Sequence, residues 1–217
     1  MKVIALGHYS RTGKDSLANL AIKAIKEYNP KLRVGKIPFA WKLKQICFEL
    51  YSWDGMREPE FYETEEGAPY RDIVLPTIGK TPVQIWVDMG TPAVRDNVFE
   101  KTWIDYVFKT DHNLDVLFVP DTRFHNEIDA AEEFGDDALV AKVVRPGFGP
   151  RKTVADRALV SCDRWHYVFG GGTVADLRPV ASQIARWVSG GPKPSQTLAQ
   201  RRLIEATEVI EPWEQAA

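Results

Sequence analysis

The chain has 217 residues, of which 44% are hydrophobic and 27% are charged. A chain of this length and composition can bury a core of its own, which excludes wholesale disorder and favours one globular unit with insertions. The 28 basic and 30 acidic residues leave a net charge of −2, so no general positive field is present to hold a polyanion and no direct nucleic-acid partner is expected.

The cysteine content and the lengths of the apolar runs indicate the cellular compartment. Cys47 and Cys162 are far apart and form neither a disulfide framework nor a metal-binding pair. The apolar run before Gly7 is too short for a signal sequence, and no later run approaches the length of a membrane span. The sequence therefore predicts a soluble cytoplasmic protein with reduced thiols and no membrane partner.

The first part of the chain alternates strand and helix signals. Residues 2–7 form a short β-branched run that stops at a glycine, which is typical of a buried parallel strand. From Lys14 to the Asn29-Pro30 break, apolar residues recur every three or four positions and predict a helix. A strand over 34–39 and a helix over 41–51 follow. This order predicts an α/β fold with a mostly parallel central sheet and helices on both faces.

The remaining chain adds an insertion, further strands and a tail. Residues 52–80 lose periodicity and are acidic and aromatic, which predicts an insertion, and residues 147–165 are predicted to be a lid-like segment that carries Arg151, Lys152 and Arg157. Residues 191–217 follow a Gly/Pro break and form a tail, helical by pattern over 197–210, that is suited to peripheral docking and leaves a homodimer open. Helices are predicted over 83–89, 98–108, 126–134 and 174–188, and strands over 114–119, 139–144 and 167–169.

The strongest local signal is the segment GHYSRTGKDS, residues 7–16, between the first predicted strand and the first predicted helix. Backbone N–H groups in such a loop bind phosphate oxygens, while a lysine reaches the outer phosphates and a hydroxyl binds Mg²⁺. Lys14 and Ser16 are the candidates for these two roles, and Arg11 lies in the same loop. Asp15 either complements the helix dipole or contacts the shell of Mg²⁺. The structural alternative is a glycine-containing turn whose Lys14 and Arg11 are merely solvated.

The match to the phosphate-loop pattern GxxxxGK[ST] is imperfect. Five residues separate Gly7 from Gly13, and Asp15 lies between Lys14 and Ser16. In strict register His8 takes the position of the first glycine, where a side chain is strained if φ is positive. Either the loop is one residue longer than the pattern or His8 adopts an ordinary dihedral angle.

A second group of charged residues follows the predicted central strands. Asp121 and Arg123 come after the strand over 114–119, at the carboxyl edge where open α/β sheets build their sites. An aspartate there can hold Mg²⁺ or its waters, and an arginine can bind a phosphate with two parallel N–H donors. Arg145 ends the strand over 139–144 in the same way. A capped turn at Asp121 and solvated arginines are the structural alternatives.

The order of these motifs resembles that of the bacteriophage-type deoxynucleoside monophosphate kinases, a branch of the P-loop nucleoside monophosphate kinases. The matching motifs are collinear from residue 2 to about residue 147, with weaker agreement to about residue 188. They are RTGKDS (11–16), Phe39-Ala40, Leu43-Lys44, Met89-Gly90-Thr91, Trp103, Asp121-Thr122-Arg123 with Glu127, and VVRPG (143–147).

The resemblance implies a P-loop three-layer sandwich over residues 1–190, with an inserted nucleotide-binding and lid region. It implies transfer of the γ-phosphoryl group of ATP to a deoxynucleoside 5′-monophosphate, in the host cytoplasm if a phage encodes the chain. Mg²⁺ would be held by Ser16 and Asp121. Catalytic roles would fall to Lys14, Arg11, Arg123 and Arg145, ATP contacts to Thr12, Gly13, Lys14, Asp15 and Ser16, and acceptor contacts to Lys44, Arg95, Asp121, Arg123 and Glu127.

The chain also departs from the family pattern. Val83 and Gln84 replace basic residues that some relatives carry before the Gly-Thr pair, which makes Arg95 the candidate for part of the acceptor clamp. Residues 153–156 read Thr-Val-Ala-Asp where the family has His-[ST]-Glu. Two other readings stay open: a different P-loop small-molecule kinase, of the phosphomevalonate or dephospho-coenzyme A type, and an ATP-binding regulatory or packaging protein without an acceptor.

Overall fold

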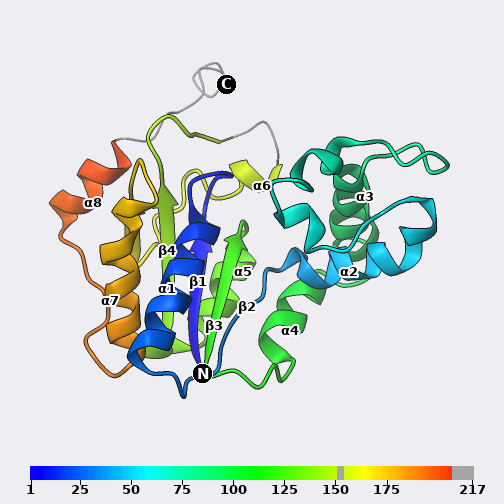
Figure 1. Ribbon diagram of the computed structural model, residues 1–217. Coiled ribbons are helices and arrows are strands. Elements are labelled where there is room, and N and C mark those ends of the chain that lie inside the picture. Colours follow the sequence, from blue (N-terminus) through cyan, green and yellow to red (C-terminus); the bar gives the residue numbers. More distant parts are fainter. Residues whose placement is uncertain (151–153, 207–217) are drawn as a thin grey trace. The chain divides into compact units, whose positions relative to one another are not determined.

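In residues 1–150 and 154–206, which the computed structural model describes, five strands form one parallel sheet (Figure 1). The strand order across the sheet is β2 (Val34–Lys36), β3 (Val116–Thr122), β1 (Lys2–Gly7), β4 (Ala138–Val144) and β5 (Tyr167–Gly170). β1, β3 and β4 are almost wholly buried, as expected for parallel strands covered on both faces. The predicted α/β fold with a parallel sheet is confirmed, and every strand pair is parallel.

Helices cover the two faces of the sheet (Figure 1). α1 (Lys14–Tyr28) and α7 (Arg178–Val188) pack against each other on one face, and α5 (His125–Glu132) lies on the other. The main core lies between the sheet and the α1–α7 pair, and the buried apolar residues of α1 recur at helical spacing. Its fully buried members include Ile4, Leu6, Leu17, Ala21, Ile25, Phe118, Leu139 and Ile184.

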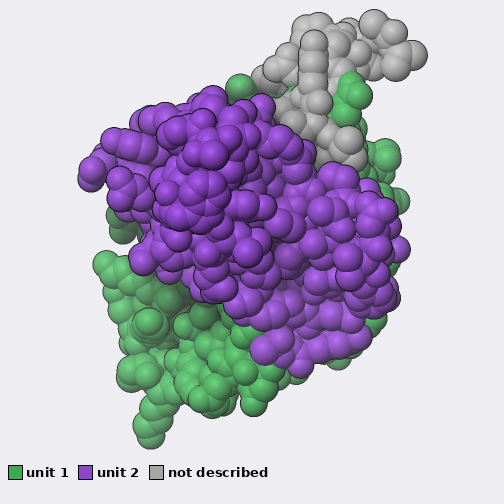
Figure 2. All heavy atoms as spheres, turned by 90° about the vertical axis from the view of Figure 1, so that its right-hand side faces the viewer, with its two compact units in different colours: residues 1–38, 111–217 green, residues 39–110 purple. Residues whose placement is uncertain are grey.

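The chain divides into two compact units (Figure 2). Unit 1 comprises residues 1–38 and 111–217 and carries the sheet, and unit 2 comprises residues 39–110. Unit 2 is therefore longer than the insertion predicted over 52–80. It contains α2 (Ala40–Tyr51), α3 (Pro82–Asp88), a π-helix (Met89–Arg95), α4 (Thr102–Lys109) and 3₁₀ turns at Ser52–Asp54, Phe61–Glu63 and Ala68–Asp72.

Unit 2 has its own small core and a buried carboxylate that organises its loops. Leu43, Cys47, Met56, Tyr62, Leu75 and Ile85 are buried together. The Asp54 side chain accepts hydrogen bonds from the backbone N–H groups of Thr77 and Ile78, at 3.1 and 2.9 Å. Burial alone would raise the pKa of Asp54, but these hydrogen bonds lower it below its usual value. The Asp54 carboxylate thus supplies hydrogen-bond acceptors for two loop N–H groups that are not paired in a sheet.

Several predicted boundaries differ from the observed ones. β3 continues through Pro120 to Thr122, whereas the predicted strand ended at Val119. The strand predicted over 34–39 ends at Lys36, and the helix predicted over 98–108 begins at Thr102. The helix predicted over 174–188 is divided into a 3₁₀ turn, Ala175–Leu177, and α7. A short helix, α6 (Val154–Arg157), lies in the segment predicted as a lid, of which residues 151–153 fall outside the described residues.

The tail contains α8 (Leu198–Glu205), which contacts the edge strand β5. Gln196, just before α8, accepts a hydrogen bond from Val168 N at 2.8 Å and donates one to Val168 O at 2.7 Å. Arg201 donates to the carbonyl oxygen of Trp165 at 2.8 Å. The tail therefore docks on the sheet edge as far as it is described, and residues 207–210 of the predicted helix lie outside the described residues.

Within the described residues, no helix combines the length and apolar character that crossing a bilayer requires. Cys47 is buried and Cys162 is partly exposed, and both thiols are free.

Candidate functional site

The loop between β1 and α1 turns at two residues with positive φ. These are Arg11, at 62°, and Gly13, at 99°. A backbone that alternates in this way directs successive N–H groups toward a common point, which suits an anion. His8 is not among the positive-φ residues of the described chain, so its φ is an ordinary one.

Gly7 is required for space rather than for its dihedral angle. A Cβ atom at this position would lie 2.8 Å from Cζ3 of Trp165 and 3.0 Å from the carbonyl oxygen of Thr122. Real Cβ atoms do not approach backbone and ring atoms this closely without displacing them. The glycine therefore allows Trp165, from the segment before β5, to pack directly on the end of β1.

Lys14 begins α1 and folds back over the loop. Its side chain donates a hydrogen bond to the carbonyl oxygen of Tyr9, and the hydroxyl of Thr12 donates to the same oxygen at 3.1 Å. Burial first, and then the nearby charge of Arg123, lower the pKa of Lys14 to about 7, while Asp15, Asp156 and Asp121 raise it. Charged groups from α1, from the end of β3 and from α6 therefore act on one buried ammonium group.

Arg123 follows β3 and is held at both its backbone and its side chain. The Glu127 carboxylate accepts hydrogen bonds from Arg123 N at 2.6 Å and Phe124 N at 3.1 Å, and so fixes the turn that leads into α5. The Arg123 guanidinium donates to Ser10 Oγ at 3.2 Å and to the buried carboxylate of Asp156. Glu127, predicted as a substrate contact, thus acts on the Arg123 backbone in this structure.

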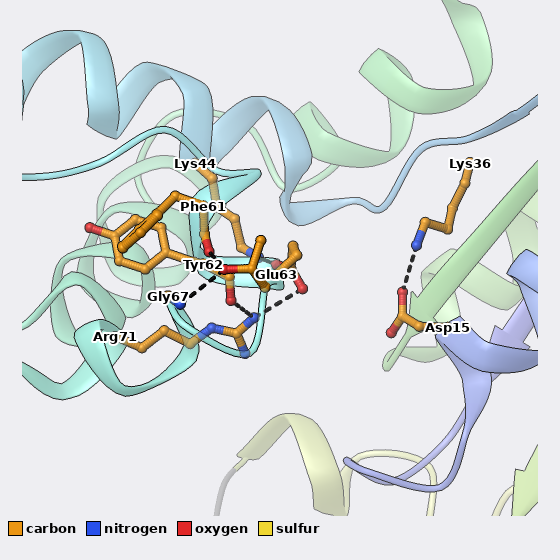
Figure 3. Close-up of polar contacts among 9 residues, drawn as sticks. Asp15, Lys36, Lys44, Phe61, Tyr62, Glu63, Gly67 and Arg71 are labelled. Atoms are coloured by element: carbon orange, nitrogen blue, oxygen red, sulfur yellow. Dashed lines mark hydrogen bonds and ion pairs between the residues drawn. The ribbon is translucent and has the colours of Figure 1, made fainter. Parts of the chain in front are cut away.

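The other predicted residues of unit 1 occupy the same loop or its surroundings. Arg145, one residue beyond β4, reaches the carbonyl oxygen of Arg11 at 3.5 Å and stacks on Phe148, 4.5 Å from the ring centroid. Asp15 is exposed and forms an ion pair with Lys36 at 3.2 Å (Figure 3). Ser16 lies in the first turn of α1 and is partly buried.

His8 and Lys142 are buried basic residues that the sequence motifs did not assign to the site. His8 is fully buried, and neither ring nitrogen has a hydrogen-bond partner among the described residues. Burial, and then the charges of Lys142, Lys14 and Arg123, lower the pKa of His8 to about 2, so its ring is neutral. Lys142 is only 6% exposed and pairs with Gly7 in the sheet register. Lys142 is thus a third cation beside Lys14 and Arg123. In the sequence its only signal is a single lysine within the apolar segment AKVV.

Two predicted substrate contacts, Lys44 and Arg95, belong to unit 2. Lys44 pairs with Glu63 at 2.7 Å, and Arg71 pairs with the same carboxylate at 2.9 Å (Figure 3). The Lys44 ammonium also lies 5.0 Å from the centroid of the Trp86 ring, within the range of a cation–π contact. Arg95 is the last residue of the π-helix.

The unit 2 motifs that carry the resemblance come together at the π-helix. The indole N–H of Trp103 donates to the carbonyl oxygen of Gly90 at 2.9 Å. A Cβ atom on Gly90 would lie 2.8 Å from Cδ2 of Leu43, so the end of the Leu43 side chain would have to move to admit one. π-helical segments are frequent at functional sites, and this one carries Met89-Gly90-Thr91.

The arrangement in unit 1 is suited to binding a polyphosphate. Lys14, Arg123 and Arg145 come from three segments, and each donates a hydrogen bond to an atom of the same loop. Ser16 and Asp121 carry oxygen atoms of the kind that Mg²⁺ accepts as ligands. Asp121 is partly buried in β3, and its charge raises the pKa of Lys14. Neither a scan against protein-family models nor a search of curated proteins returned a match to this chain.

Proposed function

We propose that this protein is a phosphotransferase that moves the γ-phosphoryl group of ATP to the 5′-phosphate of a deoxynucleoside monophosphate, giving the diphosphate and ADP. The observation that carries the proposal is the meeting of Lys14 and Arg123 at the β1–α1 loop, where Lys14 donates to Tyr9 O and Arg123 donates to Ser10 Oγ. The class of acceptor rests on the resemblance of the motifs and not on the geometry.

The β1–α1 loop and the first turn of α1 bind the donor in this proposal. The loop N–H groups contact the inner phosphates, and Lys14 contacts the β- and γ-phosphates. Ser16 and Asp121 would hold Mg²⁺, which would neutralise charge on the donor phosphates. The hydrogen bond from Lys14 to Tyr9 O is exchanged for one to a phosphate oxygen, because a phosphate is the stronger acceptor.

The reaction needs positioning and charge more than a base. The second pKa of a nucleotide phosphate is near ~6, so the acceptor is already largely dianionic at neutral pH. Two highly negative groups must be brought in line and kept from water, which would otherwise take the phosphoryl group. Arg11, Arg123 and Arg145 are assigned to the transferring and acceptor phosphates, since bidentate guanidinium groups both orient and neutralise them.

Recognition of the acceptor nucleotide is assigned to residues of unit 2. Lys44 and Arg95 are proposed to contact the acceptor nucleotide, and Lys44 is already oriented by Glu63 and Trp86. Asp121 is proposed to contact the acceptor through the Mg²⁺ shell. Glu127 contributes by holding the backbone of Arg123.

A coupled assay of ADP release tests the proposal. The protein is supplied with MgATP and each of the four deoxynucleoside monophosphates, with the four ribonucleoside monophosphates, dephospho-coenzyme A and phosphomevalonate in parallel. Release that depends on a deoxynucleoside monophosphate supports the proposal. Slow hydrolysis that no acceptor changes would instead indicate an ATP-binding regulatory or packaging protein, and turnover with a non-nucleotide acceptor would indicate another small-molecule kinase.

A further inference from the structure

The buried carboxylate of Asp156 holds the side chain of Arg123. Asp156 lies on the short helix α6 and is only 2% exposed, and its Oδ1 atom accepts a hydrogen bond from Nη1 of Arg123. Nη2 of the same guanidinium donates to Ser10 Oγ at 3.2 Å. Arg123 is therefore anchored from two sides, by α6 and by the β1–α1 loop.

The surroundings of Asp156 are rich in positive charge. Its negative charge acts on Lys14 as well as on Arg123, and Arg123 and Lys14 repel each other. A buried carboxylate without partners would be costly, and so would a buried lysine beside a partly buried arginine without a counter-charge. Asp156 meets both requirements, since one carboxylate compensates two cations that are assigned to phosphates.

We propose that Asp156 is a positioning residue, which fixes the guanidinium of Arg123 against the β1–α1 loop so that its other N–H groups are ready for a nucleotide phosphate. The inference rests on the proposed function, in which Arg123 binds the transferring phosphoryl group. Asp156 itself touches no substrate in this scheme. An arginine without this anchor samples several rotamers, and productive alignment is lost in most of them.

The kinetic test compares Asp156→Asn with Asp156→Glu. The asparagine is nearly the same size but has no charge, so we expect kcat to fall by about 10- to 100-fold with little change in the KM for ATP, as for other residues that orient a reactive group. The glutamate should recover most of this loss, because it restores the charged acceptor. The matched control is Asp129→Asn, which removes an aspartate that pairs with Arg164 at 2.6 Å on the surface and should leave both constants unchanged.

A double variant separates a positioning role from a general structural one. If Asp156 acts through Arg123, then Arg123→Gln/Asp156→Asn should lose no more activity than Arg123→Gln alone. The double variant also removes both members of the ion pair. It should therefore fold even if the single variant Asp156→Asn, which leaves the Arg123 cation uncompensated, fails to fold. Additive losses in the double variant would overturn the inference. So would tighter ATP binding in Asp156→Asn, because Asp156 would then be a competitor of the phosphate.

A measurement on the protein without nucleotide tests this inference separately from the proposed function. The guanidinium N–H signals of Arg123, assigned by NMR with Arg123→Lys, should be protected from solvent exchange in the unliganded protein and should lose that protection in Asp156→Asn. Unchanged protection would contradict the anchoring of Arg123 by Asp156. Suppose that Asp156→Asn loses the protection as expected but the wild-type protein phosphorylates no acceptor. The anchoring of Arg123 by Asp156 then still holds, and only the proposed function is rejected.

Discussion

The guanidinium group of Arg123 lies close enough to the ammonium group of Lys14 to lower its pKa, although the whole of unit 2 separates the two residues in the sequence. Parallel strands explain this proximity. β1 and β3 are neighbours in the sheet, so the segments that leave their carboxyl ends meet at one edge. Loss of either charge should therefore affect the same step.

Lys14→Ala should abolish phosphotransfer while leaving the fold intact. Removal of one cation from a phosphate site costs about 3 kcal/mol of barrier, by analogy with the loss of an oxyanion donor. The measurement is kcat/KM for ATP together with a thermal melt. Lys23→Ala, on the exposed face of α1, is the control and should behave as wild type. Turnover of Lys14→Ala within tenfold of wild type would contradict the assignment.

Gly7→Ala should destabilise unit 1, because its Cβ atom would collide with the Trp165 ring and the carbonyl oxygen of Thr122. Overpacking of this kind costs about 1–3 kcal/mol. Urea unfolding of the variant measures the loss. Gly190→Ala offers a comparison in open space, although its positive φ adds strain of a different origin. If Gly7→Ala matches wild-type stability, Trp165 does not constrain this position.

Acid should destabilise the protein through His8. Its pKa is about 2 in the folded protein, because of burial and then the charge of Lys142, against ~6.5 in an unfolded chain. Below ~6.5 the unfolded chain therefore takes up a proton that the folded protein does not, and the free energy of unfolding falls by up to about 1.4 kcal/mol per pH unit.

The comparison that isolates this effect uses His8→Gln, which should show a shallower loss of stability between pH 7 and pH 5. Urea titrations at several pH values give the slopes. His125→Gln changes an exposed histidine at the start of α5 and should keep the wild-type slope. Equal slopes for wild type and His8→Gln would show that His8 does not remain neutral when buried.

Removal of residues 191–217 should preserve phosphotransfer and increase self-association. The tail covers the backbone of the edge strand β5 through the paired hydrogen bonds between Gln196 and Val168, and an uncovered edge can pair with another chain. Gln196→Ala should show the same tendency in weaker form, measured by sedimentation, whereas Arg202→Ala on the exposed side of α8 should not. A folded but inactive truncation would place the tail in the site instead.

The regular elements of unit 1 could be predicted because their signals are local. Residues 2–7 and the helix from Lys14 were predicted with the observed start, since a β-branched run and a three-to-four spacing are written in adjacent residues. β3 extends beyond its apolar run, through Pro120 to Thr122, because pairing with β1 continues there. The extent of unit 2 depends on packing among turns that have no period of their own.

The site could be predicted only for residues that follow strand ends. Parallel strands bring their carboxyl ends to the same edge of the sheet. The order of the sequence is therefore sufficient to group the residues at or after those ends, which are Lys14, Asp121, Arg123 and Arg145. His8, Lys142 and Asp156 are buried charged or polar groups, and the charges that act on His8 and the arginine that pairs with Asp156 come from distant segments. No spacing rule could place α6 beside Arg123, because that contact depends on how the chain returns between β4 and β5.

The strand order also bears on how the chain can assemble. β1 and β2 are made first, yet β3 lies between them in the sheet and is synthesised only after all of unit 2. The first 38 residues therefore have no strand pairing available among themselves. Closing such long loops is slow, so we expect unit 2 to gain structure on the ribosome before the sheet does, and the nascent β1 to remain exposed to chaperones in the meantime.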